Sequence, residues 1–141
     1  MNKGWRFETT ELTYVSEVLS NGFGASETGA FTERLENKFS SIHGQKYGIG
    51  CNSGTSTLHA ALEAFGVGEG DEVIIPALTV AMCGYAVTHA NATPVYADVC
   101  KDTFNIDPED IKRKITSKTK AIMVVHLYGL MCDMEAIEKI A

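Results

Sequence analysis

The sequence predicts an α/β fold, with three α/β/α layers built around a mainly parallel sheet. From residue 46 onward, short apolar segments alternate with helical segments, and this alternation is typical of parallel strands joined by crossover helices. We expect strands at residues 47–51, 72–75, 94–98 and 120–125, with helices on both faces of the sheet. Residues 1–45 are then a helical lead-in segment, and residues 46–141 are the first part of a larger, incomplete domain.

The lead-in carries two helical patterns. Apolar residues recur three or four positions apart, with charged residues between them, at Phe31, Leu35, Phe39 and Ile42. This spacing predicts a helix over residues 32–41 that stops at Gly44. A similar spacing predicts an earlier helix through Leu12, Val15, Val18 and Leu19. A flexible loop is expected over residues 21–26.

The helices of the α/β region are predicted from one apolar stripe and two caps. The stripe lies at helical spacing and predicts a buried helix face formed by Leu58, Ala61, Leu62 and Phe65. Asp107 is suited to cap a helix that starts at Pro108. Within that helix, Ile111 and Ile115 are expected to face inward. Asp133 is expected to cap the last helix.

The charge balance disfavours one class of partner. The 141 residues include 12 basic and 18 acidic side chains, a formal net charge of −6, so no basic face is expected for nucleic acid or an anionic membrane. The uncharged stretch at residues 73–96 is long enough for a bilayer, but polar residues interrupt it and it is predicted to be protein core. The first six residues lack the apolar segment of a signal peptide, which favours a cytoplasmic location.

The spacing of cysteine and histidine predicts no metal site. The four cysteines are 32, 17 and 32 residues apart, with no Cys-x-x-Cys pair, at Cys51, Cys83, Cys100 and Cys132. We interpret them as reduced cysteines that serve mainly as small core residues. His43, His59 and His89 lack the spacing of metal ligands and are expected on the surface or in packing contacts.

A turn at residues 50–56 is the first candidate for ligand chemistry. It joins a predicted strand to the amphipathic helix, so backbone amides near Thr55 and Ser56 would point from the helix N-terminus toward an anion. Gly54 would allow close approach of the ligand, and the hydroxyl groups could add hydrogen bonds. Phosphate is the natural anion for such a site. Capping of the helix by Ser53 or Thr55 explains the same residues equally well.

A dinucleotide site is the second interpretation of this segment. Gly48, Gly50 and Gly54 give the pattern G-x-G-x-x-x-G. The first two glycines, however, fall in the predicted strand, and the next strand ends at Ile75 without an acidic residue for a ribose hydroxyl. A nicotinamide-binding half-domain therefore remains an alternative with weaker support.

An ordered set of motifs points to a known family. Residues 52–62 (NSGTSTLHAAL) and 68–76 (GEGDEVIIP) are followed by similar segments at residues 92–99, 104–108, 119–122 and 125–129. Together they resemble the DegT/DnrJ/EryC1/StrS family of sugar aminotransferases, and the likeness extends to the loop at residues 20–29. It covers nearly all of the chain.

The resemblance implies the large domain of a fold-type-I enzyme that uses pyridoxal 5′-phosphate (PLP), normally as a homodimer with active sites at the interface. The family transfers an amino group, typically from glutamate, to a keto-sugar carried on a nucleotide, in cell-envelope or antibiotic sugar biosynthesis. Its cofactor phosphate would lie at the turn of Ser53, Gly54, Thr55 and Ser56. The position that usually stacks an aromatic ring on the pyridine is Val80 here.

Two further residues are candidates for the cofactor site. His126 and Tyr128 follow the last predicted strand, so they are expected at the carboxyl edge of the sheet, where ligands of open α/β folds collect. A hydrogen-bonded packing role explains His126 as well.

The catalytic lysine is expected outside this sequence. Transamination needs a Schiff-base lysine, and none of the nine lysines is placed to reach a phosphate-anchored ring. The chain, expected to be an N-terminal fragment, should then be inactive alone and contain no catalytic residue. Two more alternatives stay open: a PLP-dependent sugar dehydratase of the same family, and a non-catalytic binding or assembly module.

Overall fold

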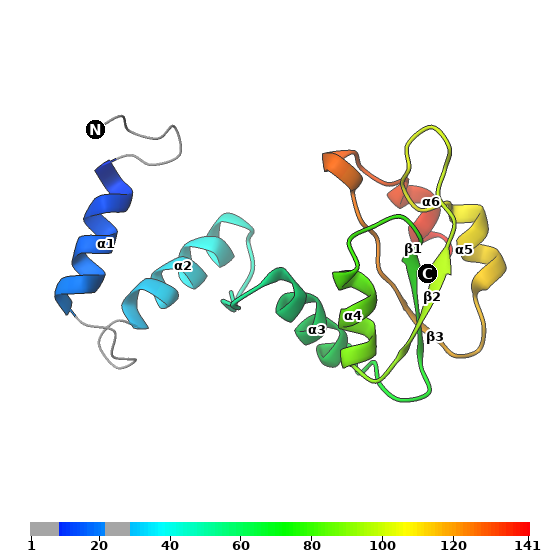
Figure 1. Cartoon of the computed structure of the whole chain (residues 1–141), viewed down its shortest axis with the longest axis horizontal. Helices are drawn as coiled ribbons and strands as arrows, with labels where there is room; N and C mark the ends of the chain where they lie inside the picture. The colour runs from blue at the N-terminus through cyan, green and yellow to red at the C-terminus, as the bar shows by residue number, and fades with distance from the viewer. Residues whose placement is uncertain (1–8, 22–28) are drawn as a thin grey trace. The chain divides into compact units, whose positions relative to one another are not determined.

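The computed structural model describes residues 9–21 and 29–141, which fall into two compact units divided between Gly50 and Cys51. Both units can be followed by colour in Figure 1. The N-terminal residues and most of the loop expected at 21–26 lie outside the described residues, as does most of the family-like segment at 20–29.

The first unit contains two helices, α1 (Thr9–Asn21) and α2 (Gly29–Ile42), as the apolar spacing predicted. The ring of Phe31 packs edge-on against Tyr14, with their centroids 5.8 Å apart. The guanidinium group of Arg34 lies over the Phe31 ring and forms an ion pair with Glu17 at 3.4 Å. Several apolar side chains of both helices are nevertheless exposed: Leu12, Val15, Leu19, Leu35, Phe39 and Ile42.

The prediction of a strand at residues 47–51 is wrong. The backbone there pairs with no strand among the described residues, and Tyr47 and Ile49 are exposed. The amide of Gly50 donates instead to the Glu36 carboxylate at 2.7 Å. The alternating apolar residues fit the local pattern of a strand. A strand forms, however, only where a neighbouring strand pairs with its backbone N–H and C=O groups.

The second unit is an α/β sandwich, which confirms the predicted fold class. It contains α3 (Gly54–Ala64), β1 (Glu72–Pro76), α4 (Met82–His89), β2 (Thr93–Ala97), α5 (Pro108–Lys114), β3 (Thr119–Ile122), the short 3-10 helix η1 (Leu127–Gly129) and α6 (Met134–Glu138). The three strands are parallel in the order β2-β1-β3. β3 ends earlier than predicted, although the amide of Met123 still bonds to the carbonyl of Ile74.

Alternate residues of β1 face two hydrophobic clusters, one on each side of the sheet. Val73 and Ile75 belong to the cluster under α3 and α4, whereas Ile74 belongs to the cluster under α5 and α6. Figure 1 shows these two helix pairs on opposite sides of the three strands. All three residues are fully buried, as expected for the central strand of a parallel sheet covered by helices.

The predicted caps are confirmed, and three predicted core positions, Ala61, Phe65 and Ile115, are wrong because they are exposed. Asp107 caps α5 through the Glu109 amide, and Asp133 caps α6 through the Ala136 amide. Phe65 and Ile115 are exposed because each lies at the C-cap of its helix, where the helical stripe ends. Leu62 is the member of the α3 stripe that is buried.

Some features are absent from the described part of the chain. None of the helices described in residues 9–21 and 29–141 is long and apolar enough to cross a membrane. Within the same residues, no group of three or more histidine, cysteine or acidic side chains is arranged to hold a metal ion. The four cysteines are free thiols, with Cys83 and Cys132 buried and Cys51 exposed.

Candidate functional site

The turn before α3 is built by Ser53. Its extended backbone ends the preceding segment, and its hydroxyl accepts a hydrogen bond from the amide of Ser56 at 3.2 Å. The Ser56 hydroxyl in turn donates to the side chain of Asn52 at 2.7 Å. The capping role considered for Ser53 is therefore present, and it organises the turn.

Two amides of this turn are available to a ligand. The N–H groups of Gly54 and Thr55 donate to no acceptor among the described residues, because the Ser53 cap serves only the next two amides of the helix. A methyl group added at Gly54 would meet no atom of a non-neighbouring residue within 4 Å. The two amides at the positive end of the α3 dipole can therefore donate hydrogen bonds to an anion of the size and charge of a phosphate group.

The N-terminus of α3 lies toward the carboxyl edge of the sheet. The end of α3 leads through a short turn into the start of β1, so the helix runs back along the sheet from the opposite edge. Leu58, in the first turns of α3, packs on the same cluster as Val125, which lies beyond the end of β3. This is the edge at which open parallel sheets bind ligands.

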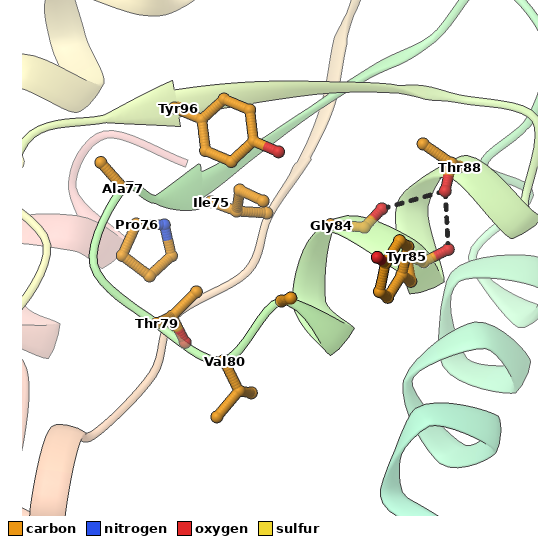
Figure 2. Close-up of a pocket in the computed structure, with 10 residues that line it drawn as sticks. Ile75, Pro76, Ala77, Thr79, Val80, Gly84, Tyr85, Thr88 and Tyr96 are labelled. Carbon is orange, nitrogen blue, oxygen red and sulfur yellow. Dashed lines mark hydrogen bonds between the residues drawn. The ribbon is translucent and has the colours of Figure 1, made fainter.

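A cavity of about 450 Å³ opens at the same edge, between the end of β1, α4 and β2. Figure 2 shows it from the side chains that line it, which include Val80, Tyr85 and Tyr96. Val80 is 64% exposed and precedes α4. Residues 53–56, 126 and 128 do not line this cavity.

Gly84 allows β2 and α4 to pack closely together at the wall of this cavity. A methyl group at Gly84 would lie 3.2 Å from the hydroxyl oxygen of Tyr96 and 3.8 Å from the side chain of Ile75. Thr88 bonds its hydroxyl to the Gly84 and Tyr85 carbonyls, drawn as dashed lines in Figure 2. Sequence reasoning did not assign these wall residues to a site, because no local pattern shows that Gly84 and Tyr96 approach each other.

His126 and Tyr128 lie on the loop that follows β3. The Nδ1 atom of His126 accepts a hydrogen bond from the amide of Cys132 at 3.1 Å. Tyr128 is in η1 with a left-handed φ of 51°, and its side chain is 100% exposed. The structure thus brings Ser53 and Ser56 into direct contact, while Val80, His126 and Tyr128 occupy two further segments of the same edge.

Asn105 is a buried polar residue beneath this loop, and it was missed as a functional candidate. Its amide group donates to the carbonyls of Leu130 and Met131 at 3.0 and 3.1 Å. Its carbonyl oxygen accepts from the amide of Leu127 at 3.1 Å. The available signal was a lone asparagine between two apolar residues, Phe104 and Ile106, since a buried amide requires several partners.

One carboxylate and one thiol near this edge have shifted pKa values. The pKa of Asp110 is lowered, first by a hydrogen bond from the amide of Asp98 at 2.7 Å and also by the Arg113 guanidinium at 2.9 Å. Burial raises the pKa of the Cys132 thiol, which donates to the Val125 carbonyl at 3.2 Å. Asp110 therefore stays ionised and Cys132 stays protonated near neutral pH.

Comparison with known proteins identifies the family. The sequence model of the DegT/DnrJ/EryC1/StrS aminotransferase family matches residues 6–141, which are nearly the whole chain. The chain belongs to this family. The resemblance drawn from the motifs at residues 52–62 and 68–76 is therefore confirmed.

Two curated relatives have names that refer to amino sugars. The chain is 44% identical to GDP-perosamine synthase from Caulobacter vibrioides over 96% of its own length and 36% of that protein. It is 48% identical to dTDP-3-amino-3,6-dideoxy-alpha-D-galactopyranose transaminase from Aneurinibacillus thermoaerophilus, over 96% of the chain and 37% of the relative. The chain thus spans about a third of the length of the curated relatives it matches.

Solved structures agree with the fold. A putative sugar aminotransferase from Streptococcus pneumoniae in its PLP form superposes with a TM-score of 0.84 at 34% identity, over 95% of this chain and 34% of that one. The structure of 3-amino-5-hydroxybenzoic acid synthase superposes with a TM-score of 0.85 at 34% identity, over 96% and 35% of the two chains.

Proposed function

We propose that these residues belong to a PLP-dependent aminotransferase that acts on nucleotide-linked keto-sugars. Membership in the aminotransferase family supports the reaction class. The names of two relatives, a GDP-perosamine synthase and a dTDP-aminosugar transaminase, support a sugar carried on a nucleotide. Residues 46–141 would form the first part of the cofactor-binding domain, with residues 1–45 as its helical lead-in.

The observation that carries this proposal is the pair of unpartnered amides at Gly54 and Thr55. The cofactor phosphate would bind there, between the helix dipole and the hydroxyl groups of Ser53, Thr55 and Ser56. When bound, PLP supplies an electron sink and a carrier for the amino group. The residues present fit its phosphate, because the donors are free and the space at Gly54 is open.

Three other residues would complete the cofactor wall. Val80 would cover one side of the ring by dispersion contacts in place of an aromatic side chain. His126 and Tyr128 would contribute polar groups from the loop after β3. These roles rest on the common location of the three residues at the carboxyl edge of the sheet.

The amino donor, assembly and location are parts of the same proposal. An amino-acid donor is supported by the name of one relative, the L-glutamine:2-deoxy-scyllo-inosose aminotransferase of Streptomyces fradiae, 40% identical over 90% of this chain. That name specifies glutamine, so glutamate as the donor is the expectation from the family resemblance. We include a homodimer and a cytoplasmic location as expectations from the family. No nucleic acid or membrane partner enters the proposal.

A dehydratase of the same family is the second candidate. The Escherichia coli GDP-4-keto-6-deoxy-D-mannose-3-dehydratase with bound hydrated PLP superposes with a TM-score of 0.83 at 25% identity, over 97% of this chain and 36% of that one. The two reactions share the cofactor, so the phosphate site serves either of them. Product analysis with a nucleotide-linked keto-sugar and an amino donor separates the two.

The phosphate site can be tested by removing one amide donor. Gly54 is the first residue of α3 and follows an extended Ser53, so Gly54→Pro removes the N–H group at a position where proline suits a helix. Loss of one hydrogen bond to a charged group should weaken PLP binding about tenfold, as measured by equilibrium dialysis.

Gly54→Ala is the matched comparison, because it adds the same Cβ atom as proline but keeps the amide. Its affinity for PLP should therefore be higher than that of Gly54→Pro. Inorganic phosphate should compete with PLP in both. Equal affinities for Gly54→Pro and Gly54→Ala would refute the phosphate assignment.

A further inference from the structure

The loop from Val125 to Cys132 is held in place mainly by side chains. Beyond Met123 the backbone leaves the sheet, and the carbonyls of Leu130 and Met131 bond to Asn105 rather than to another strand. Asn105 uses both of its donors and its carbonyl oxygen on this one loop. Aspartate lacks these donors, so the amide group itself is required.

Asn105 is itself fixed by its own turn. The amide of Cys100 donates to the Asn105 carbonyl at 2.8 Å, and the Asn105 amide donates to the Thr103 hydroxyl at 3.3 Å. Val99 and Ile106 form an antiparallel bridge on either side of this turn. The asparagine, which is only 4% exposed, is therefore a rigid anchor attached to the end of β2.

The same loop defines the chemical form of His126. An imidazole nitrogen that accepts a hydrogen bond from an N–H group carries no proton, and Nδ1 accepts from the Cys132 amide. The ring is then neutral, with its proton on Nε2. The Cys132 thiol bonds back to the Val125 carbonyl, which closes the loop on both sides of the histidine.

We propose that Asn105 is a positioning residue that, through the loop ending at Cys132, holds His126 as a neutral hydrogen-bond donor at Nε2. This inference rests on the proposed function, in which His126 faces the ligand. A neutral donor suits a ligand oxygen, such as a phenolate, carbonyl or sugar hydroxyl, and takes up no proton from it. Asn105 acts without touching the ligand.

The test is to read the protonation state of the His126 ring directly in the chain without cofactor. Proton–nitrogen correlation spectra of the nitrogen-15-labelled chain, assigned with a His126→Gln variant, should give an unprotonated Nδ1 and a protonated Nε2. A protonated Nδ1 in the unchanged chain overturns the proposal without any further variant.

Two substitutions then test Asn105. Asn105→Ala should increase hydrogen exchange at the Cys132 amide about tenfold and shift the Nδ1 signal of His126, while the Ala77 amide, bonded to Ala97 in the sheet, stays protected. Asn105→Asp, of nearly equal size, should do the same because it presents an oxygen to two carbonyls. Asp102→Asn, an exposed change on the same turn, should alter neither signal.

The results separate this proposal from the proposed function. If Asn105→Ala unfolds the sheet, as loss of Ala77 protection would reveal, Asn105→Asp and the spectrum of the unchanged chain decide the outcome. A His126 signal and Cys132 exchange unaltered in folded Asn105 variants overturn the positioning role. Failure of PLP to bind, with the ring state as described, removes the proposed function and with it the ligand contact of His126, whereas the positioning of the His126 ring by Asn105 is retained.

Discussion

The turn before α3 and the loop after β3 lie at the same edge of one sheet, yet they use their amide groups in opposite ways. In the turn, the amides of Gly54 and Thr55 have no acceptor among the described residues. In the loop, the Asn105 side chain accepts a hydrogen bond from the amide of Leu127, and the His126 side chain accepts one from the amide of Cys132. An open turn can receive a ligand, whereas a closed loop can hold a side chain in one geometry.

The largest expected effect comes from the core beneath the two segments. Ile74 supports the cluster that contains Cys132, and Ile75 supports the cluster that contains α3. Ile74→Ala should cost about 2–5 kcal/mol in the free energy of unfolding, because it deletes three carbons from a fully buried side chain. Urea unfolding measures this loss.

Ile75→Ala is the matched partner of that experiment and should cost a similar amount. Native-state hydrogen exchange should differ between the variants: Ile74→Ala should preferentially loosen the Cys132 amide, and Ile75→Ala the Val67 amide bonded to Leu62. Identical exchange patterns would mean that the two clusters do not support the two segments separately.

A smaller effect is expected at Asp110, which fastens the end of β2 next to the turn that carries Asn105. Its pKa is lower folded than unfolded, so its contribution to stability is complete above the ordinary carboxyl pKa of about 4. The contribution is lost as the pH falls through the folded-state pKa. Asp110→Asn should therefore be less stable at pH 7, and the difference from the unchanged chain should shrink below about pH 4.

Urea titrations at a series of pH values provide this measurement, with Asp102→Asn as an exposed control in the same region. Because Asp110 bonds to Asp98 and not to the α3 turn, PLP affinity at neutral pH should stay unchanged. A stability difference that does not vary with pH would show that the hydrogen bonds of Asp110 do not depend on its charge.

The smallest effect is expected at the cap of the open turn. Ser53→Ala removes the acceptor for the Ser56 amide and should cost about 1 kcal/mol in unfolding free energy. Ser53→Thr keeps the hydroxyl and should retain most of the stability. Thermal unfolding of both variants checks this, and the His126 ring signal should be the same in each, since the closed loop is anchored elsewhere.

The sequence was sufficient where the signal was local. The Asp107 cap, the Ser53 cap and the apolar β1 strand each depend on residues within a few positions, and the structure has all three. The strand at residues 47–51 failed because pairing needs a partner far along the chain. Asn105 was missed for a similar reason, since its partners lie 22 to 26 residues away.

The candidate site divides in the same way. Adjacent serine, glycine and threonine residues predicted an anion-binding turn, which stays a prediction; the structure shows that no other residue crowds Gly54. The cavity wall of Gly84 and Tyr96 could not be predicted, because the close approach of a helix glycine to a tyrosine on β2 depends on how α4 packs on the sheet.

The strand order β2-β1-β3 also determines the order in which the strands can pair while the chain is being translated. The central strand leaves the ribosome first and gains β2 as its first neighbour, but its other side stays unpaired until Thr119, 43 residues after Pro76, has been added. At typical translation rates this lasts roughly 2–9 s. During that interval one edge of β1 exposes unpaired backbone N–H and C=O groups, which can pair with another chain. This is therefore the stage at which chaperones would be most needed to prevent aggregation.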